Sequence, residues 1–330
     1  MEIEKKKNKV CAVVVTYNRK KLLIECLNAI LDQSYQVENI ILIDNASTDG
    51  TEQALKEQGL LDNPVIEYVR MDTNLGGAGG FYEGIKLAAG KDYDWIWIMD
   101  DDTIPTASCL SELLIADSYI RGDGGFTNRK ENKFSSFYAS AIYGINGETI
   151  NVPTINEKKS PTAGAYWYQY LKLGMVSIRK ATFVSLLIRK KAIKKCGLPC
   201  KDYFIWGDDS EYTERLTSYY GDAYFVGKSV AIHKRNLTNI NNVIYNETNP
   251  NRLKMYSYSF RNRFINERYY HNRSYAVVIA QLMYSIIYFI IHSMSSIGRK
   301  RGIAMIKGYW DGLTQYKKFK NYIDNQIKNE

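Results

Sequence analysis

Three adjacent carboxylates, Asp100, Asp101 and Asp102, directly follow the apolar run WIWIM, and this junction has clear potential for chemistry. If the run is a strand, Asp100 and Asp102 project to the same side of its end, because side chains alternate along a strand. Two carboxylates about 5 Å apart repel by roughly 3 kcal/mol at an effective dielectric of about 20, and a bound divalent cation reverses the sign of that interaction. Oxygen ligands with open positions suit Mg²⁺ or Mn²⁺, which would then hold substrate phosphates. A solvated acidic turn before Pro105 is the alternative.

A second acidic cluster follows the residues FIWG, where Asp208, Asp209 and Glu211 lie at a predicted helix start. Helix capping explains part of this cluster, with Asp208 as the N-cap residue and Glu211 three positions later, both favourable at the positive end of a helix dipole. Asp209 has no part in that capping. A carboxylate beside Trp206 in a partly apolar pocket has a raised pKa and suits the role of a general base.

His233 ends the apolar run SVAIH and is one of three histidines in the chain. A lone histidine is more often a satisfied core or surface group than a ligand. The carboxylates at the other predicted strand ends favour a metal-ligand role for this imidazole.

The elements that must position these residues alternate between strands and helices. Apolar runs at 10–18, 40–43, 65–71 and 95–99 predict strands that are covered on both faces. The segments between them have the apolar spacing of helices, and this alternation predicts a parallel α/β sheet. Ligands bind beyond the carboxyl ends of the strands in such sheets. The polar residues at those ends are Thr16, Asp44, Asn74 and Asp100–Asp102.

Local signals refine this picture. Asp49 and Glu52 predict a capping box that opens a helix, and NLGGAGGF predicts a glycine loop before a helix through Ile85. Residues 121–174 are polar, aromatic and irregular, and they predict loops or short hairpins. Further on, FVSLLIRKKAIKKC predicts a strand and a short basic helix, with Gly197 as the C-terminal cap.

The size and charge of the chain limit its class. With 330 residues, 45% of them hydrophobic, it can bury one large core, or one core with a smaller appendage. A formal charge of +9 suggests an anionic partner, but the basic residues are dispersed and no nucleic-acid recognition module is present. Five scattered cysteines predict free thiols in a reducing cytoplasm. The charged start MEIEKKKNK, which leads directly into a strand, predicts no signal peptide.

Other nucleotide-binding classes fit the sequence poorly. A nicotinamide-dependent dehydrogenase needs G-x-G-x-x-G directly after the first strand, where TYNRKKLL has no glycine. The residues Gly227-Lys228-Ser229 imitate the end of a P-loop, but the preceding glycine, Gly221, lies one residue too far away.

Six motifs in this order resemble those of the family-two inverting nucleotide-sugar glycosyltransferases of the GT-A fold: VVVTYNR, IDNASTDGT, NLGGAGGF, WIMDDD, WGDDSEYTER and AIHKR. The resemblance spans about residues 10–235 and is greatest to galactofuranosyltransferases, followed by rhamnosyltransferases. Gly207 departs from the galactofuranosyltransferase pattern, in which tryptophan more often directly precedes the aspartates. The resemblance implies a Rossmann-like, mostly parallel sheet flanked by helices.

The resemblance also implies roles for the matched residues. The donor-binding residues would be Thr16, Tyr17, Asp44, Asn74, Gly76, Asp100 and Asp101. The metal ligands would be Asp100, Asp102 and His233, which would hold Mn²⁺ or Mg²⁺ against the donor diphosphate. Asp209 would accept the proton of the acceptor hydroxyl. The acceptor-side residues would be Trp206, Asp208 and, as either an aromatic platform or a packing residue, Trp167.

The resemblance implies transfer of a sugar, first of all galactofuranose from UDP-galactofuranose, onto a hydroxyl of a lipid-linked or oligosaccharide glycan in cell-surface polysaccharide synthesis. A rhamnosyltransferase that uses TDP-rhamnose is the alternative within the same class. An inactive sugar-binding or scaffold subunit of a glycan assembly complex is the alternative of another class, and the intact acidic clusters argue against it.

The C-terminal part of the sequence predicts a helical region. We expect a catalytic domain over 1–235 and a helical region over 236–330, which begins with an asparagine-rich linker at 236–251. Residues 275–291 are apolar, at the short limit for a membrane span, and have basic residues on both sides. Attachment to the inner face of the cell membrane is the first expectation. A buried helix or a contact in a homo-oligomer is the second, and a true span is the third.

Overall fold

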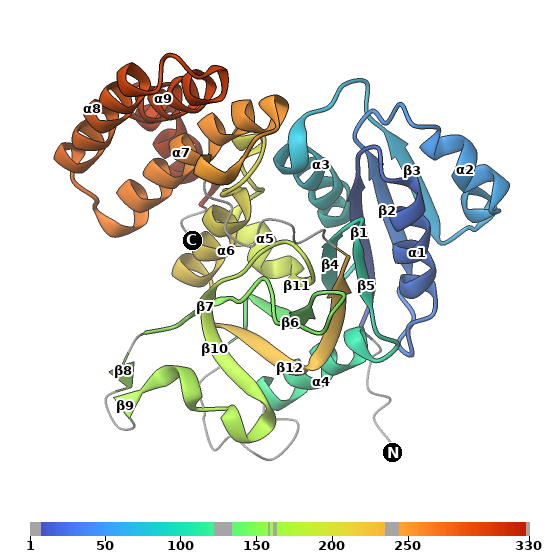
Figure 1. The fold of residues 1–330 in the computed structure, drawn as a ribbon. Coiled ribbons are helices and arrows are strands. Elements are labelled where there is room, and N and C mark those ends of the chain that lie inside the picture. Colours follow the sequence, from blue (N-terminus) through green and yellow to red (C-terminus); the bar gives the residue numbers. More distant parts are fainter. Residues whose placement is uncertain (1–7, 122–133, 158, 161–163, 235–243, 328–330) are drawn as a thin grey trace, which may run out of the picture.

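The computed structural model describes residues 8–121, 134–157, 159–160, 164–234 and 244–327. These residues form a central mixed β-sheet with helices on both faces, and a further group of C-terminal helices lies beside it (Figure 1). The predicted α/β fold with a C-terminal helical extension is therefore confirmed.

The N-terminal half of the sheet is parallel and has the strand order β3-β2-β1-β4. Its register places Thr16 beside Asp44 and Val15 beside Asp100. The carboxyl ends of three strands therefore meet at one edge, as the sequence predicts. The four strands are β1 (Val10–Thr16), β2 (Asn39–Asp44), β3 (Ile66–Arg70) and β4 (Trp95–Asp100).

The other half of the sheet continues from β4 in the order β11-β6-β12-β10-β7, and β5 pairs with β12. The antiparallel pairing of β5 with β12 sets His233 opposite Thr103, immediately after the three aspartates. The six strands are β5 (Thr103–Pro105), β6 (Phe137–Tyr143), β7 (Thr154–Ile155), β10 (Met175–Lys180), β11 (Leu186–Arg189) and β12 (Ala223–His233). A separate pair consists of β8 (Lys159–Ser160) and β9 (Gly164–Ala165).

The interpretation of 121–174 as loops or short hairpins is wrong for β6, which is a buried strand between β11 and β12. Its sequence FYASAIY has small and polar residues where a buried strand usually has branched apolar ones. Ser140 is buried because its hydroxyl lies 2.8 Å from the hydroxyls of both Ser185 and Ser229. Hydrogen bonding between strands therefore replaces the apolar pattern that the sequence lacks.

Side chains alternate along β1 and so divide the core into two layers. Val10, Ala12 and Val14 pack in one apolar cluster, and Cys11, Val13 and Val15 pack in the other. The first face carries α1 (Lys20–Leu31), α2 (Thr51–Glu57) and α4 (Cys109–Arg121). The second face carries α3 (Gly76–Gly90), α5 (Lys190–Cys196) and α6 (Asp208–Tyr219). Short 3-10 helices are η1 (Leu60–Asp62), η2 (Tyr166–Tyr168), η3 (Leu171–Leu173), η4 (Lys201–Tyr203) and η5 (Ile244–Asn246).

The predicted glycine loop is wrong, because these glycines lie inside α3, which begins at Gly76. They allow a close approach between the helix and the sheet. A Cβ on Gly80 would lie 2.4 Å from Val15 Cγ1, and one on Gly84 would lie 2.4 Å from Val13 Cγ1. The glycines therefore permit α3 to pack directly on β1.

The predicted capping box before α2 is also wrong, since the N-cap residue is Gly50. Asp49 Oδ1 accepts hydrogen bonds from the hydroxyl of Thr51 at 2.5 Å and from its amide at 3.1 Å. Glu52 pairs with Lys56 at 2.6 Å instead of reaching back to the helix start.

Two smaller predictions are confirmed. Gly197 follows α5 with φ 74°, and its amide donates to the carbonyl of Ile193. All five cysteines are free and buried.

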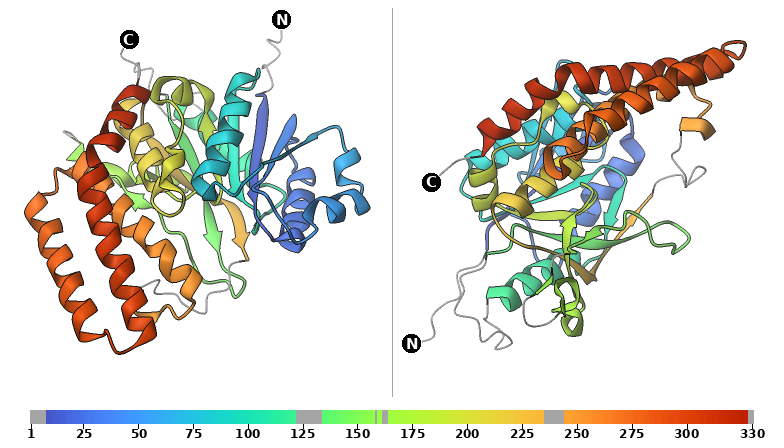
Figure 2. Two further views of the ribbon diagram at one scale, coloured as in Figure 1. Left: turned by 90° about the horizontal axis from the view of Figure 1, so that it is seen from above. Right: turned by 90° about the vertical axis from the view of Figure 1, so that its left-hand side faces the viewer.

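The C-terminal helices are α7 (Pro250–His271), α8 (Tyr275–Ile291) and α9 (Ser296–Gln326). Both α7 and α8 pack against α9 (Figure 2). Residues 235–243 of the predicted linker lie outside the described part of the chain. Among the described helices, none has the length and apolarity needed to cross a membrane.

Candidate active site

The structure brings together the three predicted metal ligands, Asp100, Asp102 and His233. Asp100 ends β4, Asp102 lies in the following turn, and His233 ends β12. The amide of Lys234 donates to the carbonyl of Asp102 at 2.8 Å, which joins the two segments through the backbone. One ligand atom from each of the three side chains lies within 4.8 Å of the other two.

The donor set of this group fits a divalent cation. Asp102 Oδ1 is buried and lies 2.9 Å from His233 Nε2, but no donor is aligned with it for a hydrogen bond. A buried carboxylate oxygen without such a donor is costly unless a cation compensates it. Two carboxylates and an imidazole are ligands that Mn²⁺ accepts, and carboxylates also suit Mg²⁺.

The pKa values of the three aspartates are shifted to different extents and in different directions. Burial, together with the carboxylates of Asp102 and Asp101, raises the pKa of Asp100 well above its ordinary value. Burial raises the pKa of Asp101 to about 6, against the opposing charge of Arg19. Burial also acts to raise the pKa of Asp102, but His233 and Arg19 outweigh it and hold this pKa below its ordinary value. The protein partners of the cluster thus stabilise the charged form of Asp102 but not that of Asp100.

Arg19 is a site residue that sequence reasoning missed. Its Nη1 lies 2.5 Å from Asp102 Oδ2 and 3.3 Å from Asp101 Oδ1, and half of its side chain is exposed. The sequence contains a signal for it, because a cation three residues after the end of β1 lies at the same sheet edge as the aspartates.

The end of β1 holds Asp101 directly. The hydroxyl of Thr16 donates to Asp101 Oδ2 at 2.7 Å, and Thr16 is 1% exposed. The side chain of Tyr17, next along the chain, is 44% exposed. Of these two predicted donor-binding residues, Tyr17 is therefore accessible to a ligand, whereas the buried Thr16 holds Asp101 of the acidic cluster.

Asp44 is fully buried and already bound by protein groups. Its Oδ2 accepts from the hydroxyl of Tyr68 at 2.7 Å and lies 3.1 Å from Arg70 Nη1. Its Oδ1 accepts from the amide of Ser47 at 2.8 Å. These contacts shape the loop after β2, and the predicted contact of Asp44 with a nucleotide stays a prediction.

Asn74 and Gly76 are tied to the end of β2 through Asn45, which sequence reasoning missed. Asn45 Nδ2 donates to Asn74 Oδ1 at 3.0 Å and to the carbonyl of Gly76 at 2.9 Å. Asn45 Oδ1 accepts from the amide of Leu75 at 2.9 Å. One amide side chain therefore fixes the start of α3 against the strand ends.

The start of α3 also touches the segment that carries the second acidic cluster. Gly76 has φ 73°, and a Cβ there would lie 2.1 Å from the carbonyl oxygen of Phe204. The same oxygen accepts from the amide of Ala78 at 3.1 Å. Only glycine at position 76 permits this approach.

The predicted capping roles of Asp208 and Glu211 are wrong. The N-cap residue of α6 is Gly207, with φ 94°, and it makes no side-chain cap. Glu211 is fully buried, where it pairs with Arg215 at 2.7 Å and accepts from the hydroxyl of Tyr270 at 2.8 Å. The helix therefore begins one residue earlier than a capping aspartate would set it.

The pKa values of Asp208 and Asp209 are both raised above the ordinary value. Burial and the Asp209 carboxylate raise the pKa of Asp208 to about 8, and burial also raises the pKa of Asp209. Asp209 Oδ1 accepts from the amide of Ser210 at 2.6 Å, which favours its charged form. Asp208 therefore keeps its proton at neutral pH, and the Ser210 amide favours the charged form of Asp209.

The second acidic cluster acts electrostatically on the first. The carboxylate of Asp208 is among the groups that raise the pKa of Asp100. Asp208, which directly precedes the predicted base, therefore acts electrostatically on a predicted metal ligand that lies 108 residues earlier in the sequence.

The loop before Asp208 is strained and is held by α7. Phe204, Trp206 and Gly207 have φ of 64°, 57° and 94°, and each left-handed non-glycine residue costs about 1–3 kcal/mol. Asn266 Nδ2 donates to the carbonyl of Gly207 at 2.9 Å. Asn262 Nδ2 contacts the carbonyls of Tyr203 at 3.0 Å, Ile205 at 3.3 Å and Trp206 at 2.8 Å. Helix α7 thus contributes to the site from beyond residue 235, and the predicted division there stays a prediction.

The two acceptor-side tryptophans lie in different settings. Trp206 is half-buried and its ring packs against Tyr256 of α7, with centroids 5.1 Å apart. Trp167 lies in η2, which packs on β10, and its ring meets Tyr168 at 5.5 Å. The described contacts of Trp167 are those of a packing residue, and its role as a platform stays a prediction.

Known proteins resemble this chain in sequence and fold. Residues 11–116 match the family model described as Glycosyl transferase family 2. The chain is 38% identical over 106 residues to "Galactofuranosyltransferase GlfT1" of Mycolicibacterium smegmatis, covering 32% of this chain and 34% of the relative. It is 38% identical over 123 residues to "Abequosyltransferase RfbV" of Salmonella typhimurium, covering 36% and 35%. The matched part of the chain thus spans about a third of the length of these two curated relatives.

Solved structures share the fold at low sequence identity. "Crystal structure of GalNAc-T7 with UDP, GalNAc and Mn2+" aligns with 97% of this chain and 57% of its own, with a TM-score of 0.61 and 14% identity. "Crystal structure of S. aureus TarS 1-349" covers 94% of this chain and 92% of its own, with a TM-score of 0.50 and 14% identity. These likenesses show the fold, and the predicted GT-A fold is confirmed.

Proposed function

We propose, from the glycosyl transferase family 2 domain that residues 11–116 of this chain form, that the protein is a metal-dependent inverting glycosyltransferase. The observation that carries the proposal is the group of candidate metal ligands that two strand ends form at one edge of a GT-A sheet. Asp100, Asp102 and His233 group their ligand atoms within 4.8 Å, and Asp208 acts on the pKa of Asp100. A nucleotide-sugar donor, whose diphosphate needs both cationic and polar partners, suits this arrangement.

The residues of the first cluster would bind and orient the donor. A divalent cation held by Asp100, Asp102 and His233 would offset the negative charge on the leaving nucleoside diphosphate. Thr16 and Arg19 fix Asp101 from two sides, so that its carboxylate is positioned before a donor sugar arrives. Such prior positioning avoids a reorganisation cost during the reaction.

Asp209 would act as the general base. Asp208 holds its proton with a pKa of about 8, and the amide of Ser210 favours the charged form of Asp209 that a base requires. Asp209 takes the proton of an acceptor hydroxyl as that oxygen attacks the anomeric carbon in line. A bond forms from the acceptor oxygen to the anomeric carbon, and the bond from this carbon to the diphosphate breaks. A single displacement of this kind inverts the configuration.

The donor sugar of first choice is galactofuranose, carried by UDP. The name of the relative that is 38% identical over 106 residues supports this choice. A rhamnosyltransferase that uses TDP-rhamnose is the second candidate, because the same sequence motifs are similar to those of rhamnosyltransferases. The acceptor is a hydroxyl of a lipid-linked or oligosaccharide glycan in cell-surface polysaccharide synthesis.

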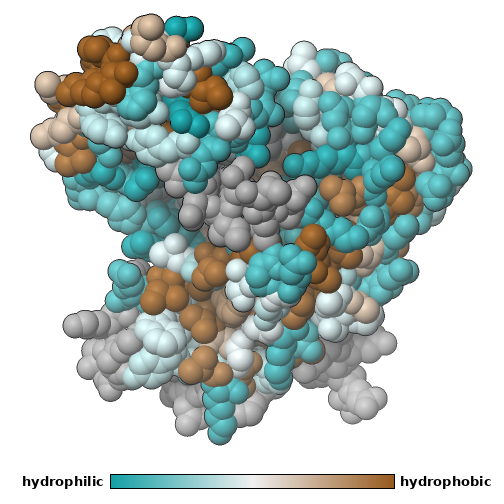
Figure 3. All heavy atoms as spheres, in the orientation of Figure 1, coloured by the Kyte–Doolittle hydropathy of each residue, from teal (hydrophilic) through white to brown (hydrophobic). Residues whose placement is uncertain are grey.

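Helix α8 would attach the enzyme to the inner face of the cell membrane, where lipid-linked acceptors lie. Apolar residues gather over this part of the surface in Figure 3. The basic residues Arg299 and Lys300 are exposed near the start of α9, which packs against α8. Trp310, further along α9, is 58% exposed. Apolar, tryptophan and basic side chains together suit an anionic lipid surface. The exposed apolar residues of α8 are Tyr275, Val277, Ile279, Met283, Tyr284, Ile286, Ile287, Ile290 and Ile291.

Co-sedimentation with anionic phospholipid vesicles tests the attachment. The wild-type protein should pellet with the vesicles, and the double variant Ile287→Glu, Ile291→Glu should stay in the supernatant. Ile145→Glu is the matched control, since this residue is 61% exposed but lies outside α8. A wild-type protein that forms a dimer, ignores vesicles and becomes monomeric in the double variant would contradict attachment and assign the face to a contact between copies.

Release of nucleoside diphosphate tests the enzymatic proposal. The protein is incubated with Mn²⁺, a glycan acceptor and, separately, UDP-galactofuranose, TDP-rhamnose, UDP-glucose and UDP-galactose. Release from UDP-galactofuranose, and its loss in Asp209→Asn, is the expected result. An absence of release from every donor, with and without acceptor, would instead favour an inactive sugar-binding subunit.

A further inference from the structure

We propose that Asn151 is a positioning residue that fixes the imidazole of His233 in the one neutral tautomer able to bind a divalent cation. The inference rests on the metal site proposed above. Asn151 lies between β6 and β7, outside every motif of the sequence resemblance.

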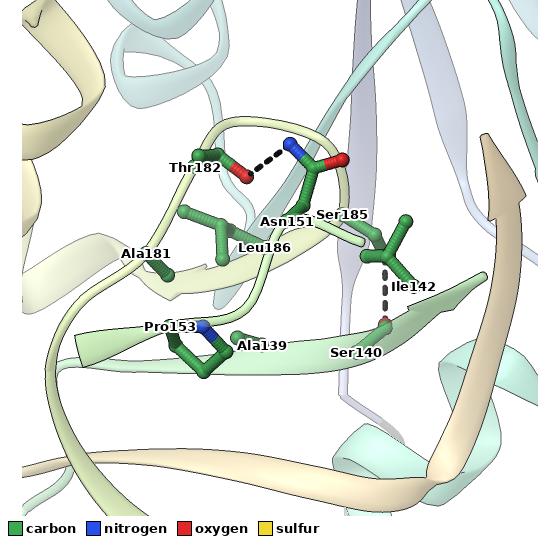
Figure 4. Close-up of a pocket in the computed structure, with 9 residues that line it drawn as sticks. All are labelled: Ala139, Ser140, Ile142, Asn151, Pro153, Ala181, Thr182, Ser185 and Leu186. Atoms are coloured by element: carbon green, nitrogen blue, oxygen red, sulfur yellow. Dashed lines mark hydrogen bonds between the residues drawn. The ribbon is translucent and has the colours of Figure 1, made fainter. Parts of the chain in front are cut away.

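Asn151 connects two side chains through the two ends of its amide. Its Nδ2 donates to the hydroxyl of Thr182 at 3.2 Å, as Figure 4 shows. Its Oδ1 lies 2.9 Å from Nδ1 of His233. In this amide orientation the nitrogen meets Thr182 and the oxygen is the atom that faces the imidazole.

This orientation decides which imidazole nitrogen carries the hydrogen. An amide oxygen only accepts hydrogen bonds, so Nδ1 of His233 must donate. In the neutral ring Nε2 is then left with a lone pair, and in the absence of a cation Nε2 can take a second hydrogen and donate it to Asp102. Nε2 is also the atom that lies 2.9 Å from Asp102 Oδ1, on the side of the predicted metal ligands.

The opposite amide orientation would have the opposite effect. An Nδ2 group facing the ring would donate to Nδ1, and the hydrogen would move to Nε2, which could then ligate nothing. The Thr182 hydroxyl can donate as well as accept, so the orientation of the Asn151 amide in the structure, and not this contact, favours the binding-competent form. Partners of this kind behind a metal ligand typically change metal affinity by about 10–100-fold when they are removed.

The backbone of Asn151 offers a competing explanation that variants can separate. Asn151 has φ 51°, a left-handed conformation that asparagine, aspartate and glycine tolerate better than other residues. Asn151→Gly keeps this backbone conformation but removes the amide. Asn151→Asp keeps both the conformation and an oxygen acceptor facing His233.

Imidazole ¹⁵N NMR of the metal-free protein, at a pH high enough for the ring to be neutral, tests the tautomer directly. The chain has three histidines, so the signals of His233 are identified by their loss in His233→Gln. The wild-type protein and Asn151→Asp should show hydrogen on Nδ1, and Asn151→Gly should lose this preference. Hydrogen on Nε2 in the wild-type protein, or an unchanged spectrum in Asn151→Gly, would overturn the inference.

Titration of Mn²⁺ by calorimetry supplies a second readout without catalysis. Asn151→Gly should bind Mn²⁺ about 10–100-fold more weakly than the wild type, and Asn151→Asp should restore the affinity. Equal affinity in the wild type and Asn151→Gly would show a purely backbone role and overturn the proposal. A wild-type protein with hydrogen on Nδ1 but no Mn²⁺ binding would refute the metal site itself and leave the tautomer assignment supported.

Discussion

The guanidinium of Arg19 lies 2.5 Å from Asp102 Oδ2 and 3.3 Å from Asp101 Oδ1, so that one half-exposed cation serves two buried carboxylates. Asp100, the third carboxylate, is left with its pKa raised by burial and by the other two. A further positive charge near Asp100 would therefore be favourable. This imbalance is the physical reason why a divalent cation should stabilise the fold as well as bind the donor.

Replacing Arg19 should increase the dependence of stability on metal. In Arg19→Gln the metal-free protein should lose about 1–3 kcal/mol, because two buried carboxylates lose a charged partner. The thermal shift caused by Mn²⁺ should be larger than in the wild type, since the ion then supplies the missing charge. Differential scanning fluorimetry with EDTA or Mn²⁺ measures both effects. Lys21→Gln removes an equal charge from an exposed position of α1 and should change neither; a Mn²⁺ shift in Arg19→Gln no larger than in the wild type would contradict the argument.

Asp208 should make the protein less stable as the pH rises. Its pKa is raised from 3.8 to about 8 in the folded state, so the folded protein holds a proton there that the unfolded chain releases. Between pH 4 and pH 8, about the interval between these two pKa values, the free energy of unfolding falls as the pH rises. Asp208→Asn removes this contribution and should therefore gain stability relative to the wild type between pH 5 and pH 8 in urea unfolding. Parallel pH curves for the two proteins would show that Asp208 is not protonated in the fold.

Asp209→Asn should lose transfer while retaining donor binding. The amide cannot accept the hydroxyl proton, so kcat should fall by about 10²–10⁴-fold, whereas the binding of nucleoside diphosphate with Mn²⁺ should change little. Asp202→Asn is the matched control, because Asp202 pairs with Lys318 at the surface. Substantial turnover in Asp209→Asn would exclude this residue as the base.

Asn262 should affect turnover more than metal binding. Its Nδ2 contacts three carbonyls of the loop before Asp208, and Asn262→Ala should destabilise the protein by about 1–3 kcal/mol. The strained loop should then relax, so kcat should fall below that of Asn251→Ala, an exposed position of the same helix. Affinity for Mn²⁺ should remain, since its ligands lie elsewhere. If Asn262→Ala folds with full kcat, α7 does not position the base.

The positions of the acidic residues could be predicted because they follow from short-range patterns. WIWIM and VCAVVV are continuous apolar runs, and parallel strands bring their carboxyl ends to one edge. The sequence therefore predicted that Asp100, Asp102 and His233 belong together, and the structure groups their ligand atoms. The same local reasoning failed for β6, where Ser140 is buried by hydrogen bonds to distant serines.

The supporting residues could not be predicted because their partners lie far away in the sequence. Asn262 meets carbonyls at least 56 residues earlier, and Asn151 meets a histidine 82 residues later. An asparagine in a polar helix or loop has no pattern that reveals such a partner. The wrong prediction of capping by Asp208 has a similar cause, since the N-cap is the left-handed Gly207, whose carbonyl accepts from Asn266, 59 residues later.

Equilibrium binding of UDP and of TDP, with Mn²⁺ and with EDTA, tests the central claim of a metal-dependent nucleotide site most directly. The account predicts that at least one of the two diphosphates binds only with Mn²⁺, and that Asp102→Asn abolishes this binding without unfolding the protein. Binding of either diphosphate that is equally tight in EDTA and unaffected by Asp102→Asn would contradict the account.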